Sequence, residues 1–399
     1  MTTAKRWRPV ARKLCNYSVL VFVPLAMASA AHAKTDLVVT GSVRGQAASN
    51  PYLTSGIDRS VVSAVVSLSP TLTFSDAESE IQLSGTVQHT EFARLYPSSQ
   101  AASAGLNGKW RLSPRWSVNT SARFNTSIVG ENGIFNFDRI QLPTIGDISL
   151  IGARTRQRSL EFQTGATYQP SARDTFNFGL FASDFRVLGS LSGLSNASYG
   201  GNASYSRQIS ARSSVGLSGN AVRFECRSLP SCQVDSYQPE LTFSTQLSSF
   251  WTLNASAGAT ISRLRLPSES GTSISPAGSV SLCRRDPRLS FCLGANRSIA
   301  PSSSNGARPS TSITSSLKYQ LTQKESIGFN VAYAESGASA LRRDTYSFFS
   351  ARVSGERQIA RRVSMYVDGG YDSSSDPIIG RRGNVSVSLG LNFSLGRGI

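Results

Sequence analysis

The sequence predicts an all-β fold, a single transmembrane antiparallel up-and-down barrel of about 18 strands, with 16 strands as the alternative. Three observations predict it. Apolar and polar residues alternate with period two along most of the chain. The alternating segments are about 10–14 residues long, which exceeds the usual strand of soluble proteins and suffices for a tilted strand to cross a bilayer. Short polar turns recur about every 35–45 residues.

The first 33 residues are typical of a secretory signal peptide. Five basic residues precede an apolar stretch from Val19 to Ala31, and Ala31-His32-Ala33 is a small-x-small cleavage site. We expect cleavage after Ala33. The chain then divides into residues 34–60, a periplasmic segment or a first strand and loop, and residues 61–399, the barrel.

The alternation is clearest in two segments. From Trp251 to Ile261 the odd positions are apolar or small and the even positions are polar or Gly, and Val385–Leu395 repeats this pattern. Because successive side chains of a strand point to opposite faces, one face of each strand is apolar and the other polar. Lipid outside and a polar lumen inside satisfy both faces.

The spacing of turns and loops is a second regular pattern. Eight short turns alternate with nine longer segments rich in Gly, Ser, Pro and Asn, and together they connect 18 strands. An even count places both ends of the barrel in the periplasm. Lipid offers no hydrogen-bond partner to an open sheet edge, so the sheet is expected to close. A soluble sandwich or β-helix is the competing fold, but neither usually sustains so many long strands.

Aromatic residues gather near the short turns, where a girdle at the periplasmic interface is expected. They are Trp110, Trp116, Tyr168, Phe176, Phe250, Trp251 and Tyr319.

The charge balance predicts anionic partners. The chain carries +17, and the signal holds five basic and no acidic residues, which leaves +12 for the remainder. In the cell envelope such a surface meets outer-membrane lipid, lipopolysaccharide phosphates or acidic polysaccharide, and export makes nucleic acid a poor partner. Two groups of residues are candidates. Basic residues of the predicted lumen face are Lys109, Arg111, Arg123, Lys318 and Arg352, and residues at long loops that could hold lipopolysaccharide phosphates are Arg342, Arg343, Arg381 and Arg382.

Four cysteines are disulfide candidates, because export permits oxidation. Cys226 and Cys232 share one long loop, and Cys283 and Cys292 flank a short turn on the predicted lumen face. Zinc is the alternative for each pair, but no histidine after the signal lies near either one.

The sequence offers no catalytic, cofactor or metal site, and we do not expect an enzyme. His89, beside Glu91, is the single histidine after the signal and lacks a serine two residues away, so a polar residue at a strand end explains it better than a lipid hydrolase does. Asp36–Gly41 is similar to the energy-coupling box of TonB-dependent transporters, but the chain has no room for their plug and 22 strands.

The segment from Gly45 to Leu53, with Asn50-Pro51-Tyr52 at its centre, resembles a stretch of outer-membrane β-barrel proteins found with exopolysaccharide gene clusters. The regular succession of predicted hairpins across residues 61–399 is similar as well. The resemblance implies a role in secreting or assembling exopolysaccharide beside the polysaccharide-export machinery, after insertion by the barrel-assembly machinery. The alternatives are a porin-like diffusion channel with anion preference and a lipid-modifying enzyme.

Overall fold

The computed structural model describes residues 34–55, 60–128, 135–136, 144–145, 151–152, 154–189, 195–226, 232–265, 270–302, 306–337, 344–377 and 380–396. The predicted signal peptide lies outside the described residues. Within the described part of the chain, no helix is long and apolar enough to span a membrane.

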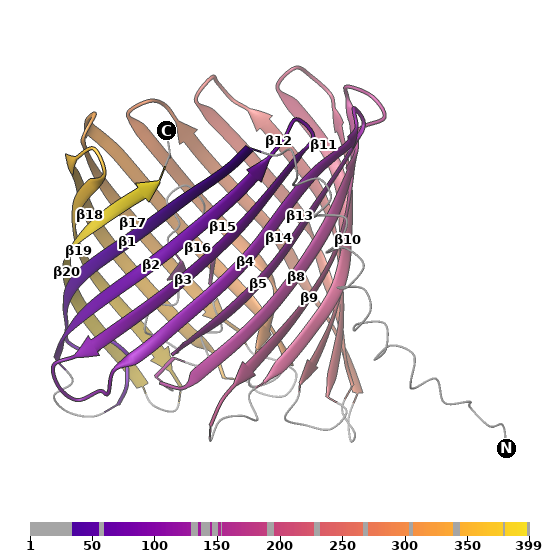
Figure 1. Ribbon diagram of the computed structural model, residues 1–399. Coiled ribbons are helices and arrows are strands. Elements are labelled where there is room, and N and C mark those ends of the chain that lie inside the picture. Colours follow the sequence, from indigo (N-terminus) through magenta and orange to yellow (C-terminus); the bar gives the residue numbers. More distant parts are fainter. Residues whose placement is uncertain are drawn as a thin grey trace.

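One sheet contains all the long strands (Figure 1). They are β1 (Lys34–Ala48), β2 (Val61–Ser75), β3 (Ser79–Phe92), β4 (Ser99–Ser113), β5 (Trp116–Ile128), β8 (Arg156–Tyr168), β9 (Asp174–Val187), β10 (Asn196–Gln208), β11 (Ser213–Cys226), β12 (Gln233–Gln246), β13 (Trp251–Arg265), β14 (Ser270–Arg285), β15 (Leu289–Ser302), β16 (Gly306–Thr322), β17 (Glu325–Ser336), β18 (Tyr346–Ala360), β19 (Val363–Asp376) and β20 (Gly380–Gly396). Two short strands, β6 (Phe135–Asn136) and β7 (Thr144–Ile145), pair only with each other.

The sheet is closed, and the prediction of an 18-stranded antiparallel barrel is confirmed. Each long strand pairs with the next, and β1 pairs with both β2 and β20, from Val38 opposite Gly396 to Ala48 opposite Ser386. Residues 34–48 therefore form the strand that completes the ring rather than a separate tail. Closure leaves no free edge between the first and last strands.

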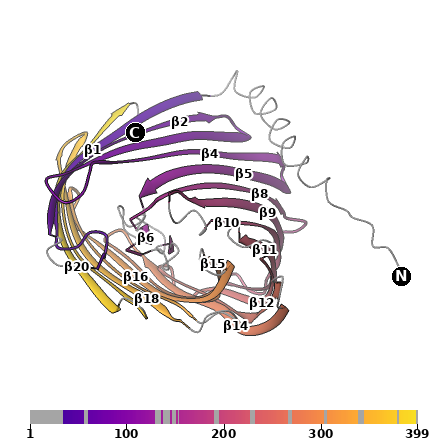
Figure 2. The same cartoon turned by 90° about the horizontal axis from the view of Figure 1, so that it is seen from below.

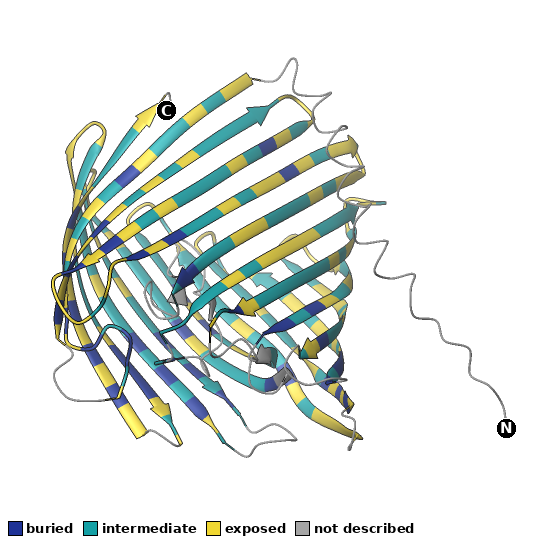
Figure 3. Ribbon diagram, turned by 60° about the horizontal axis from the view of Figure 1, so that its bottom comes forward, coloured by how far each residue is buried: buried dark blue, intermediate teal, exposed yellow. Residues whose placement is uncertain are grey.

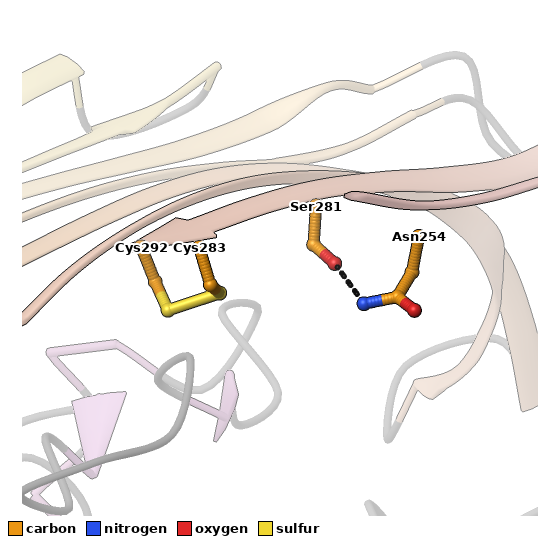
Figure 4. The surroundings of a disulfide bond; sticks show 4 residues. All are labelled: Asn254, Ser281, Cys283 and Cys292. Atoms are coloured by element: carbon orange, nitrogen blue, oxygen red, sulfur yellow. Dashed lines mark hydrogen bonds between the residues drawn. A yellow bond between two sulfur atoms is a disulfide. The ribbon is translucent and has the colours of Figure 1, made fainter. Parts of the chain in front are cut away.

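Three side chains of β14 and β15 mark the inner face of the sheet. Figure 4 shows Ser281, Cys283 and Cys292 on the side of the sheet where the β6–β7 pair lies, and Figure 2 shows β6 inside the ring. Leu282 of β14 therefore faces outward, as do Leu253 and Leu293, its partners in the two neighbouring ladders. Extending the registers around the ring assigns a face to every described barrel strand.

The outward face is an apolar belt. Leu217 of β11 is 59% exposed and its ladder partner Leu241 of β12 is 66% exposed, although both lie in the middle of their strands. Bands of alternating exposure run along the strands in Figure 3. Exposed aliphatic and aromatic side chains continue around the ring, which is far more apolar surface than a soluble monomer presents.

The short turns share a side-chain cap. In the β2–β3 turn, Asp76 accepts hydrogen bonds from the backbone N–H groups of Glu78 and Ser79, at 2.8 and 2.6 Å. The N–H of Glu78, followed by the hydroxyl and N–H of Ser79, lowers the pKa of Asp76 below its usual range. The residues at the equivalent place in six other turns are Ser113, Ser171, Ser210, Ser248, Asp286 and Thr322.

Aromatic rings stack at the same end of the barrel, as the girdle prediction requires. The rings of Trp116 and Tyr168 lie 4.5 Å apart, and those of Phe176 and Tyr205 lie 4.9 Å apart. Short turns and aromatic rings thus mark one end of the barrel, and the long connections mark the other (Figure 1).

Candidate functional site

The lumen is the candidate site, because the inner face collects the polar side chains. Register places all five predicted lumen cations there. Lys109 lies opposite Glu80 and Asn119, Arg123 lies opposite Glu161, and Lys318 lies opposite Ser290. Arg111 faces inward beside Ser117, and Arg352 faces inward opposite Asn330 and Gly370.

Lys109, Arg111 and Arg123 form one basic group on β4 and β5. They lie at alternate positions of two paired strands, and all three are exposed to the lumen. Glu80 and Glu161 flank the group on β3 and β8. The lumen wall at this group therefore carries three positive charges and two negative ones.

Arg352 belongs to a network on the opposite side of the β1–β20 seam. Its guanidinium lies 3.1 Å from Asp372 and 3.8 Å from Asp368. Ser350 donates to Asp372 at 2.7 Å, and Ser388 donates to Asp368. Because two carboxylates surround this guanidinium, Arg352 stiffens the wall and contributes little net attraction for anions.

The short-turn mouth of the lumen holds a polar recess of about 780 Å³. Its lining includes Lys318, Lys324, Arg361 and Arg362, with Glu356 as the acidic member. Three of these cations lie in or beside turns that sequence reasoning treated only as connections.

The long-loop mouth is narrowed by a segment that crosses the lumen. Ile151 lies just before β8, yet it is buried against Leu53, Ala332 and Phe348. Ala332 and Phe348 belong to β17 and β18, which lie about half a turn of the ring away from β8. Arg154, in the same segment, lies with its guanidinium carbon 4.7 Å from the centre of the Tyr96 ring.

A second narrowing comes from the β15–β16 hairpin. The ladder between β14 and β15 ends at Gly278 opposite Arg297, so the outer half of β15 pairs with β16 alone. Ile299 packs against the buried inward side chains Phe224, Val234 and Leu264. Figure 2 shows β15 reaching into the ring of strands.

Replacing Ile151 with Asp is expected to raise the single-channel conductance in planar bilayers. A carboxylate does not remain in an apolar cluster without a partner, so the contact across the lumen is lost and the passage widens. Ile209→Asp, in an exposed short turn, is the matched control. Equal conductance for the wild type and Ile151→Asp would show that this contact does not limit the passage.

The structure joins both predicted cysteine pairs in disulfide bonds. Cys226–Cys232 closes the loop between β11 and β12, and Cys283–Cys292 links paired positions of β14 and β15 on the lumen side (Figure 4). Among the described residues, no group of three His, Cys, Asp or Glu side chains could hold a metal ion.

The four arginines predicted to bind lipopolysaccharide phosphates do not share one environment. Arg342 and Arg343 lie outside the described residues. Arg381 faces outward and contacts Ser373. Arg382 corrects the prediction, since it faces inward, is buried, and donates to the carbonyl oxygen of Leu53 at 2.7 Å. The alternation of β20 explains the difference, because adjacent residues of a strand point to opposite faces.

Asn50-Pro51-Tyr52, the motif of the resemblance, builds the first long loop. The Asn50 side chain accepts from the N–H of Thr54 and donates to its carbonyl oxygen, both at 3.1 Å. The Asn50 N–H donates to Asn384 of β20 at 2.9 Å, which ties the loop to the closing strand. Tyr52 is buried beside Tyr96.

His89 lies at the outward face near the long-loop end of β3, and its Nε2 is 3.3 Å from a carboxylate oxygen of Glu91. Both side chains are largely exposed.

No protein-family model matches the chain, and no curated protein matches it. Several solved structures are similar. OpdL of Pseudomonas aeruginosa is 11% identical with a TM-score of 0.48, covering 92% of this chain and 99% of its own. OprD of the same organism is 9% identical with a TM-score of 0.45, covering 92% and 98%. The ferric citrate transporter FecA is 10% identical with a TM-score of 0.49, covering 90% and 78%.

Proposed function

We propose that the chain is an outer-membrane channel through which small hydrophilic solutes diffuse, with a preference for anions. The observation that carries the proposal is a closed ring whose outward face is apolar around its whole circumference and whose inward face is polar. Such a barrel satisfies its backbone hydrogen bonds in lipid and leaves water only inside. The signal-like first 33 residues support export to the outer membrane, where the barrel-assembly machinery would insert it.

The anion preference is supported by the basic group of Lys109, Arg111 and Arg123 and by the basic recess at the short-turn mouth. Cations along a narrow passage lower the energy of an anion there and raise that of a cation. The narrowed long-loop mouth favours small solutes over a polymer strand.

The purified mature chain is expected to give steady single-channel currents in planar bilayers. Under a KCl gradient, the reversal potential should have the sign of chloride preference, because the basic group on β4 and β5 and the recess at the short-turn mouth each hold more positive than negative charges. A barrel that inserts but carries no current would contradict the proposal.

The exopolysaccharide role is a second candidate, and the Asn50-Pro51-Tyr52 resemblance favours it. These residues also have a structural role, because Asn50 hydrogen-bonds within the first loop and to Asn384 of the closing strand. The geometry therefore favours the channel. Normal polysaccharide export by a strain lacking this chain would remove the second candidate.

A further inference from the structure

The outward face of β5 to β13 carries an apolar groove of about 890 Å³. Its floor is made of small residues, Gly201, Ala203, Gly219 and Ala221, and larger side chains such as Phe178 and Tyr237 form its walls. The groove follows ladder partners across the strands, from Val118 of β5 to Ile261 of β13. Six strand spacings make it roughly 29 Å long, which leaves room for one extended fatty-acyl chain along part of its length.

A basic row borders the long-loop end of this groove. Arg223, Asp235 and Arg263 are successive ladder partners on β11, β12 and β13, and all face outward. The row directly below them is Ala221, Tyr237 and Ile261, which line the groove. Two residues along a strand separate the rows, a distance of roughly 7 Å.

The charges of this row do not cancel. Arg223 lies 2.6 Å from Asp235, and Arg265 lies 3.3 Å from the other oxygen of the same carboxylate. Asp235 is buried, whereas the side chains of Arg223 and Arg265 are 40% and 50% exposed. Arg263 is exposed as well. Arg223 and Arg265 contact the buried carboxylate, and Arg263 is its ladder partner on β13. Glu225, two residues from Arg223 on the same face, adds a second carboxylate and accepts from the hydroxyl of Tyr199. Three guanidinium groups against two carboxylates leave an excess of positive charge and of donors at the surface.

We propose that this face binds a phosphorylated glycolipid of the outer leaflet, the lipid A part of lipopolysaccharide. Its phosphate is held by Arg223, Arg263 and Arg265, and one of its acyl chains lies in the groove. The inference rests on the proposed outer-membrane location. Charge complementarity selects an anionic headgroup, and the position at the long-loop end selects the outer leaflet. These arginines differ from the four that the sequence predicted.

Two variants test the site without touching the lumen. The double variant Arg263→Gln with Arg265→Gln removes two side chains that would donate hydrogen bonds to the phosphate. It leaves the Arg223–Asp235 pair in place, so the buried carboxylate keeps its closest partner. Gly219→Trp fills the groove, and the backbone accepts a side chain there because a Cβ added at Gly219 meets no atom within 4 Å.

Each variant has a matched control. Gly45 of β1 also faces outward, and a Cβ added there meets no atom within 4 Å, so Gly45→Trp places the same indole on another part of the belt. Arg207→Gln with Arg357→Gln removes two outward arginines at the short-turn end.

The measurement is retention of diphosphoryl lipid A by the detergent-solubilised mature chain in native mass spectrometry. Binding to the arginine variant and to Gly219→Trp should each be at least about tenfold weaker than to the wild type, since charge-assisted hydrogen bonds or the groove are lost. The two controls should bind as the wild type does, and dephosphorylated lipid A should bind weakly to all.

Equal lipid A binding by all variants would overturn the proposal. Phosphatidylglycerol binding as tightly as lipid A would also overturn it. A change of oligomeric state in Gly219→Trp with lipid binding intact would overturn it too, because the groove would then be an interface between copies of the chain. All variants should keep the wild-type conductance. A wild-type chain that binds lipid A without conducting would contradict the channel alone.

Discussion

Replacing Leu217 with Arg is expected to destabilise the lipid-inserted barrel by about 2–4 kcal/mol. Leu217 is the fifth of the fourteen residues of β11, within the apolar belt, faces outward and is 59% exposed. In a bilayer this exposed surface meets hydrocarbon, where a guanidinium loses its hydration. The measurement is reversible denaturant unfolding of the chain in phospholipid vesicles.

The matched control is the next residue. Ser218 faces the lumen opposite Ser204 and Glu240, so an arginine there meets water and a carboxylate. Ser218→Arg should unfold within about 0.5 kcal/mol of the wild type, the range of a substitution away from packed or buried features. Equal destabilisation by the two arginines would contradict the assignment of faces on β11.

Replacing Lys109, Arg111 and Arg123 together with Glu is expected to reverse the ion preference of the channel. The change converts three positive charges of the lumen wall into three negative ones beside Glu80 and Glu161. The local field then attracts cations, and the reversal potential under a KCl gradient should change sign. The three residues are exposed in the lumen, so the barrel should still fold.

Arg207→Glu, on the outward face near the short turns, is the control for a change in total charge. It should leave the sign of the reversal potential unchanged. A triple variant that kept its preference for chloride would place the selective part of the passage elsewhere.

Most of the barrel could be predicted from sequence because its main signal is local. The alternation in Trp251–Ile261 indicates which side chains share a face, and the turns indicate where each strand ends. The same alternation, followed back from Val385 to Arg382, also places Arg382 inside. The prediction of a surface role overlooked that step.

The narrowing of the lumen could not be predicted in this way. Ile151 meets Leu53, Ala332 and Phe348, which lie far apart in the chain and meet only after the ring has closed. The basic row of Arg223 and Arg263 likewise depends on the register across three strands. Neither arrangement leaves a pattern along the sequence itself.

The assignment of faces is tested most directly on β20. Single nitroxide labels at consecutive positions from Leu391 to Leu395 would be placed in the vesicle-inserted chain, and collision with oxygen and with a water-soluble nickel chelate would be measured. Labels at 391, 393 and 395 should collide mainly with oxygen, and those at 392 and 394, which line the lumen recess, mainly with the chelate. The same preference at all five positions would contradict a barrel with lipid outside and water inside.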